Sequence, residues 1–104
     1  MEHVEFLLKD DDGKILGGIT GTMYFHHLHI DFLWVDQSVC HGGYGSQLLH
    51  KIEGIAKEKG CRLILLDSFS FQAPEFYKRH GYREFGVVDD HPKGYSQHFL
   101  EKRL

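Results

Sequence analysis

The first part of the chain contains three runs rich in β-branched, aromatic and other apolar residues, which predicts strands. The runs lie at residues 4–9, 14–25 and 28–35, and they are separated by Asp12-Gly13 and His26-His27. An Asp-Gly pair between two such runs is typical of a hairpin turn. Gly17, Gly18 and Gly21 inside the second run indicate a bulge or a close backbone approach. Together the runs predict an antiparallel meander.

The third run changes character half way along. His29 and Asp31 alternate with Leu28, Ile30 and Phe32. We therefore expect the two polar side chains on one face of the sheet and the three apolar side chains on the other. The remainder of the run is apolar on both faces, as in a buried strand.

From residue 44 to residue 59 the period becomes helical. The apolar positions are Leu48, Leu49, Ile52, Ile55 and Ala56. This spacing predicts an amphipathic helix, with Glu53 among the residues of its solvent face. Gly60 is a suitable residue to end it.

The rest of the chain predicts four further elements. These are a strand at 62–67, a helix at 74–80 that begins with Pro74, and strands at 83–88 and 95–102 joined by a hairpin loop at 89–94. The resulting order is βββαβαββ. A β-α-β crossover makes the strands on either side of the long helix parallel neighbours. The predicted class is therefore α+β, with a mixed, mostly antiparallel sheet.

Length and composition limit the number of domains, the class of partner and the cellular location. The 104 residues suit one domain spanning 1–104. A net charge of −3 argues against a nucleic-acid partner, and apolar runs of at most four residues argue against a membrane span. The start of the chain does not resemble a signal peptide. Cys40 and Cys61 form no C-x-x-C pair, and so few cysteines favour a cytoplasmic location.

A glycine-rich loop at residues 40–46 separates the third strand from the long helix. Glycines let the backbone approach a ligand, and the free N–H groups of a helix start favour anions. A tight strand-to-helix turn explains the same glycines. The loop is not a P-loop, because Gly45 is followed by Ser46-Gln47 rather than Lys-Ser or Lys-Thr. It is not a dinucleotide fingerprint either, because Leu48 occupies the place of the third glycine.

Two segments resemble the GNAT superfamily of N-acetyltransferases. Residues 35–49, ending in GYGSQLL, are similar to its acyl-CoA-binding motif Arg/Gln-x-x-Gly-x-Gly/Ala. Residues 70–82, SFQAPEFYKRHGY, are similar to its signature Asn-x-x-Ala-x-x-Leu-Tyr-x-x-x-Gly-Phe. The resemblance covers nearly the whole chain, from the second strand of the family's fold onward. It implies a GNAT-like acyl-CoA N-acyltransferase fold.

The resemblance also implies an activity, namely direct transfer of an acetyl group from acetyl-CoA to an amine of a small molecule or protein. Backbone groups of Leu33 and Val35 would hold the pantetheine arm like an extra strand, and the Leu33 N–H would polarise the acetyl carbonyl. Ser70, at the Asn position, would donate one hydrogen bond. Tyr77 would protonate the CoA thiolate, as an ordinary Tyr pKa near ~10 allows. The N–H groups expected to hold the pyrophosphate are those of Cys40, His41, Gly42, Gly43, Tyr44, Gly45 and Ser46.

The general base is left open between His29, Asp31 and a water molecule. His29 and Asp31 lie where relatives place catalytic Glu or His residues, and a histidine accepts a proton at neutral pH. A structural pair facing solvent is the alternative reading of these two residues. Asp67 ends a strand in the cleft region and is a candidate for orienting the acceptor. His27 and His29 share a strand face, but no second cluster has zinc-ligand spacing, so we expect no metal.

The sequence departs from the family in two places. Cys40 stands at the Arg/Gln position, which predicts weaker CoA binding and raises an alternative, a catalytically weakened CoA-binding module that serves as a partner-binding subunit. The chain also begins at the family's second strand, which indicates either a natural short form that lacks the usual N-terminal strand and helices or a truncated chain. We expect an exposed apolar region near Phe6, Leu16 and Ile30 and, covering it, a homodimer that light scattering would detect.

Overall fold

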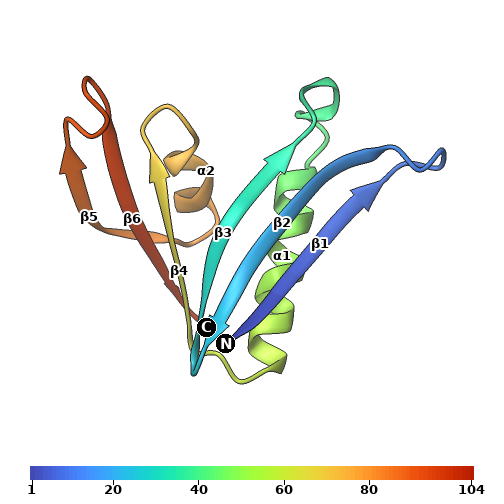
Figure 1. The fold of residues 1–104 in the computed structure, drawn as a ribbon, viewed down its shortest axis with the longest axis horizontal. Coiled ribbons are helices and arrows are strands. Elements are labelled where there is room, and N and C mark those ends of the chain that lie inside the picture. Colours follow the sequence, from blue (N-terminus) through green and yellow to red (C-terminus); the bar gives the residue numbers. More distant parts are fainter.

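A computed structural model describes all 104 residues of the chain (Figure 1). Its elements are β1 (Glu2–Lys9), β2 (Ile15–Tyr24), β3 (His27–Val35), a short 3₁₀ turn (Gln37–Val39), α1 (Tyr44–Glu58), β4 (Leu63–Phe69), α2 (Pro74–Arg79), β5 (Arg83–Asp89) and β6 (Ser96–Arg103). The predicted order βββαβαββ is confirmed. The boundaries differ from the predicted ones by at most two residues.

The six strands form one sheet in the order β1-β2-β3-β4-β6-β5. Only β3 and β4 run parallel, and they pair over three residues, His27–His29 with Leu63–Leu65. The mixed, mostly antiparallel sheet and the parallel crossover are therefore confirmed. Beyond these pairs β3 and β4 diverge towards their carboxyl ends, so that the sheet opens like a V (Figure 1). This divergence leaves the β4-facing edge of β3 unpaired from residue 30 onward.

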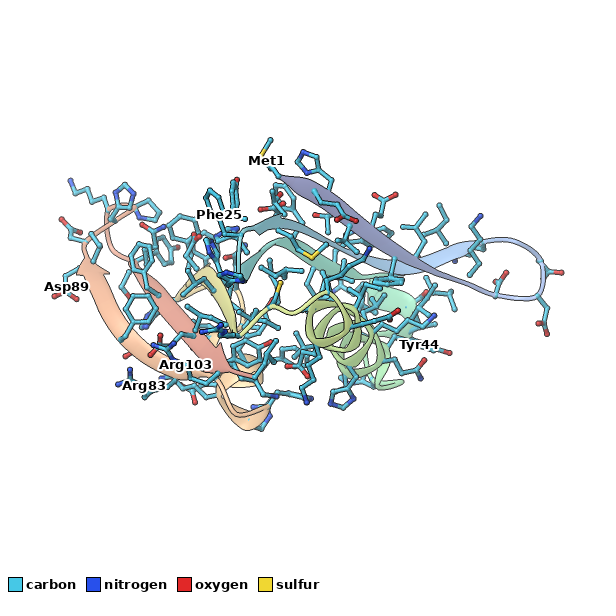
Figure 2. All side chains as sticks on the ribbon, turned by 90° about the horizontal axis from the view of Figure 1, so that it is seen from below. Met1, Phe25, Tyr44, Arg83, Asp89 and Arg103 are labelled. Atoms are coloured by element: carbon cyan, nitrogen blue, oxygen red, sulfur yellow. The ribbon has the colours of Figure 1, made fainter.

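Both helices lie on the same face of the sheet (Figure 2). Two side-chain contacts connect them and the segments beside them. The Tyr82 hydroxyl, just after α2, donates to Glu53 on α1 at 2.8 Å, and Ser46 on α1 lies 2.8 Å from His80 after α2. No helix covers the opposite face, which we call the open face. It carries Phe32, with 73% of its surface exposed, and Trp34, with 47% exposed.

A bulge in β3 explains why Phe32 is exposed. Thr20 of β2 is opposite Phe32, whereas Gly21 is opposite Ile30, so Asp31 is an extra residue in β3. A bulge shifts the alternation of side chains by one position. The prediction that Phe32 shares a face with Leu28 and Ile30 is therefore wrong. Downstream of the bulge it is Leu33 and Val35 that pack against the core.

The expected exposed apolar region near Phe6, Leu16 and Ile30 is also wrong. Leu16 and Ile30 are buried, and Phe6 is half-buried against the core. The reason is that α1 itself packs on β1, β2 and β3 and covers their inner face.

The inner face of α1 follows the predicted period. Leu48, Leu49, Ile52 and Ala56 are all fully buried, at 0% exposure. Glu53 contradicts its predicted place on the solvent face, because it is buried. Its Oε2 accepts hydrogen bonds from the Tyr82 hydroxyl at 2.8 Å and from Lys102 Nζ at 3.0 Å, and these donors offset the cost of burying the carboxylate.

Neither helix is long and apolar enough to span a lipid bilayer.

Gly17 should be a sensitive position for stability. A Cβ there would lie 2.8 Å from the main-chain oxygen of Trp34 and 3.3 Å from Leu48 Cδ1, so Gly17→Ala should lower the free energy of unfolding by about 1–3 kcal/mol. Gly54 is the matched control, because a Cβ there meets no atom within 4 Å and it lies inside α1. Gly54→Ala should raise stability by about 0.5–1 kcal/mol. Urea unfolding measures both, and equal effects of the two substitutions would contradict this packing.

Candidate active site

The V between β3 and β4 forms a cleft of about 400 Å³. Its wall comes from β3, the loop before α1, the start of α1, β4 and α2. The predicted site residues that line it are Asp31, Leu33, Val35, Cys40, Gly43, Gly45, Ser46 and Tyr77. The predicted residues outside its lining are His29, His41, Gly42, Tyr44 and Ser70. No lysine or arginine lines the cleft.

The unpaired edge of β3 directs hydrogen-bond donors into the cleft. Asp36 N–H, at the end of the strand, donates to Leu16 O at 2.7 Å on the β2 side. Successive residues of a strand direct their N–H groups to opposite sides. Leu33 and Val35 therefore direct theirs towards β4, where the strand has no partner. This edge can pair with an extended ligand as a further strand would.

The loop before α1 offers fewer free donors than predicted. Cys40 N–H donates to Gln37 O at 3.5 Å and Gly42 N–H donates to Val39 O at 3.0 Å, so these two groups are used within the loop. The prediction that the N–H groups of Cys40 and Gly42 are free to bind a ligand is therefore wrong. Gly43 has φ +77, a left-handed conformation that suits glycine and turns the chain into the helix.

The start of α1 is an uncapped helix end. The N–H groups of Tyr44, Gly45 and Ser46 donate no hydrogen bond within the chain, and no side chain caps the helix. No acidic residue lies in its first turn. These donors and the helix dipole favour an anion here. A Cβ on Gly45 would lie 3.3 Å from Phe76 Cζ, so the glycine also lets α2 approach.

A histidine that the sequence did not indicate holds the two helices together at this end. His80 Nδ1 lies 2.8 Å from Phe76 O, and its Nε2 lies 2.8 Å from Ser46 Oγ. Because a carbonyl only accepts, Nδ1 carries the proton and Nε2 accepts from the serine in the neutral ring. The Ser46 hydroxyl is thus committed to His80, and its N–H remains available.

Tyr77 is the one phenol that lines the cleft. It is 8% exposed, and its ring packs edge-on against Phe76 at 5.2 Å and Tyr82 at 5.7 Å. Burial raises the pKa of Tyr77 to about 12. Its hydroxyl therefore keeps its proton at neutral pH and can donate a hydrogen bond to an atom in the cleft.

His29 and Asp31 form a direct pair beside the cleft. His29 Nδ1 lies 2.8 Å from Asp31 Oδ1, and Asp31 Oδ2 accepts from Thr22 Oγ1 at 2.7 Å. Thr22 Oγ1 is in turn 3.2 Å from His3 Nδ1. The carboxylate holds the proton on His29 Nδ1 and leaves Nε2 as an acceptor. No sequence pattern reveals Thr22 and His3, since only the strand register brings them here.

Ser70 does not line the cleft. Its hydroxyl accepts from Ser96 N–H at 3.0 Å, and its own N–H donates to Ser96 O at 2.8 Å, so it joins β4 to β6. Ser68 lines the cleft instead, buried two residues earlier, and its Oγ accepts from Ala73 N–H at 3.4 Å.

No group of three or more His, Cys, Asp and Glu side chains has an arrangement that could hold a metal ion.

Residues 1–82 match the model of the acetyltransferase (GNAT) family. Blasticidin-S acetyltransferase of Streptomyces morookaense is 40% identical over 93 residues, covering 88% of this chain and 68% of that protein. An acetyltransferase of Agrobacterium fabrum is 28% identical over 97 residues, which cover 93% of this chain and 71% of that protein. The crystal structure of an acetyltransferase from Bacillus cereus ATCC 14579 is 80% identical with a TM-score of 0.97, covering 99% of this chain and 74% of that one.

The raised pKa of Tyr77 makes stability fall in alkali. The unfolded chain releases this proton near pH 10 and the folded chain near pH 12, so the folded state binds more protons between these values. The contribution is complete below pH 10 and is lost as the pH rises to 12, by about 2–3 kcal/mol. Tyr77→Phe should therefore lose less unfolding free energy than the native chain over this range. Parallel losses in both proteins, measured by urea unfolding, would refute the assignment.

Proposed function

The chain belongs to the acetyltransferase (GNAT) family, and we propose that it transfers an acetyl group directly from acetyl-CoA to an amine of a small molecule. One observation carries this proposal. A single cleft brings together the unpaired donors of β3, the uncapped start of α1 and the protonated hydroxyl of Tyr77. The relative named blasticidin-S acetyltransferase supports a small-molecule acceptor for this chain.

The residues of the cleft fit acetyl-CoA. The free N–H groups of Leu33 and Val35 suit the amide-containing arm, and those of Tyr44, Gly45 and Ser46 suit the pyrophosphate. Bound acetyl-CoA supplies the acetyl group as a thioester, so transfer forms an N–C bond, breaks the C–S bond and leaves the free thiol. No lysine or arginine lines the cleft to neutralise the phosphate charge, so the backbone donors and the helix dipole must do so.

His29 is the residue that we assign as general base. Its Nε2 accepts no hydrogen bond, whereas both oxygens of Asp31 already do. A proton taken at Nε2 makes the ring cationic, and the adjacent Asp31 carboxylate stabilises that charge. Asp31 is thus a positioning residue, with Thr22 fixing its second oxygen.

Tyr77 provides a hydrogen-bond donor for the thiolate that leaves in the reaction. With a pKa of about 12, its phenol is a weaker acid than a thiol at ~8.5, so complete proton transfer to a thiolate is uphill. It donates a hydrogen bond that stabilises negative charge on a departing sulfur. This refines the predicted role of the residue as a proton donor.

Homodimer formation and a cytoplasmic location remain predictions. For the first, the exposed Phe32 and Trp34 on the open face offer an apolar surface. For the second, Cys40 and Cys61 are both free thiols.

Thiol release from acetyl-CoA tests the function. A panel of blasticidin S, simple primary amines and a lysine-containing peptide should yield CoA thiol with at least one acceptor. Tyr77→Phe should then lower kcat by about 10²-fold while the Kd for acetyl-CoA changes less than about twofold. Tyr24→Phe, at an exposed strand end, is the matched control and should match the native chain. No thiol release above the hydrolysis background with the whole panel would favour the CoA-binding module without catalysis.

Replacing Cys40 should restore the charge that the family motif carries. Cys40 is exposed, lines the cleft and has helical backbone angles, so Cys40→Arg is sterically tolerated. A cation here should lower the Kd for CoA by about tenfold in low salt, and less in 1 M salt. Glu58→Gln adds the same net charge at the far end of α1 and should leave the Kd unchanged. Calorimetry measures both, and equal Kd values for the two variants would contradict this account of the loop.

A further inference from the structure

His29 lies between two carboxylates. Its Nδ1 is 2.8 Å from Asp31 Oδ1, and its Nε2 is 3.5 Å from Asp67 Oδ1 on β4. The first contact is a hydrogen bond, whereas the second is an ion-pair distance without a hydrogen bond. All three side chains are about one-third exposed, so a ligand can reach them from the open face.

Neither carboxylate has a lysine or arginine partner in the chain, and His29 is the only basic side chain that contacts them. The second oxygen of each is held by a neutral donor, Thr22 Oγ1 on Asp31 at 2.7 Å and Gln97 Nε2 on Asp67 at 3.0 Å. Neither forms an ion pair with lysine or arginine. With His29 neutral, two negative charges therefore face one small region of the surface.

Other half-buried carboxylates of the sheet do have lysine or arginine partners. Glu84 pairs with Lys78 at 3.4 Å, and Glu101 pairs with Arg83. With His29 neutral, the charges of Asp31 and Asp67 thus have no lysine or arginine to compensate them. A bound cation would compensate it.

The surface beside His29 is hollowed and also favours a cation. A depression on the open face is lined by His3, Glu5, Thr20 and Phe32, together with the His29–Asp31 pair, and no lysine or arginine lines it. Thr20 Oγ1 is buried there without any hydrogen-bond partner, so it is a group that a ligand could satisfy. The exposed Phe32 ring adds a surface that attracts cations.

We propose that Asp67 binds the protonated amine of the acceptor and presents it to His29. This inference rests on the proposed acetyltransferase function and names its acceptor class: a small amine that carries positive charge and lacks a carboxylate beside its nitrogen. The ammonium can bridge Asp67 Oδ1 and His29 Nε2, which lie 3.5 Å apart, by donating one N–H to each from the exposed side of the pair.

The proton then moves within this arrangement. The N–H bond of the ammonium group that points at His29 breaks, and the released proton forms a bond with His29 Nε2. The amine becomes neutral and nucleophilic, and the positive charge now lies on the imidazole between Asp31 and Asp67. Since the charge stays between the same two carboxylates, the transfer requires little rearrangement of the site.

Asp67→Asn tests the proposal. The substitution keeps a side chain of the same shape and removes the negative charge, so KM for the most active amine of the panel should rise at least tenfold. The kcat should change less than about threefold, and the Kd for acetyl-CoA should stay unchanged. Asp11→Asn removes the same charge from an exposed turn and controls for net charge. Asp67→Glu should recover part of the lost affinity, and thermal melting shows that each variant is folded.

A second readout needs neither acetyl-CoA nor turnover. Propylammonium chloride, titrated to about 100 mM against the same concentration of sodium chloride, should shift the NMR signals of the His29 ring. These signals are identified by their absence from His29→Gln. The shift should persist in Asp11→Asn and vanish in Asp67→Asn.

The outcomes separate the two proposals. An unchanged KM and an unchanged propylammonium response in Asp67→Asn overturn the role of Asp67, even if the native chain acetylates amines. Turnover that favours acceptors with a carboxylate beside the amine overturns the acceptor class. No turnover with any amine refutes the acetyltransferase function, and the NMR response still decides whether Asp67 binds an ammonium ion.

Discussion

The short pairing of β3 with β4 is the constraint on which the site depends. Only His27–His29 pair with Leu63–Leu65, and then the parallel strands separate. Backbone donors left without a partner normally cost free energy when they are buried. Here the separation places them at the wall of a cleft, where Leu33 and Val35 remain free to bind a ligand. A longer β3–β4 ladder would satisfy the same donors and close the cleft.

Charge is distributed around the cleft in two opposite ways. At the loop before α1 the polar groups are N–H donors and a helix end, which suit an anion without any basic side chain. On the open face beside His29 the charged groups are Asp31 and Asp67, which suit a cation. The two regions meet along β3, where Asp31 borders both hollows. An anionic donor and a cationic acceptor would thus approach from opposite sides of one strand.

Local patterns sufficed to predict the elements but not the details of the site. The periodicity around Ile52 and the glycines near Gly45 predicted α1 and the loop, because spacing and backbone freedom are local properties. The bulge at Asp31, the burial of Glu53 and the absence of Ser70 from the cleft lining were not predicted. Each depends on strand register or on a partner far along the chain, as Glu53 depends on Tyr82 and Lys102, so no local pattern contains it.

In the proposed function, unpaired backbone donors on β3 and at the start of α1 hold the cofactor. Amide NMR during titration with CoA tests it most directly. The N–H signals of Leu33, Val35 and Gly45 should shift together with one Kd, whereas that of Gly42, which already donates to Val39 O, should shift less. Shifts confined to other parts of the chain, with Leu33 and Gly45 unmoved at saturating CoA, would contradict the account.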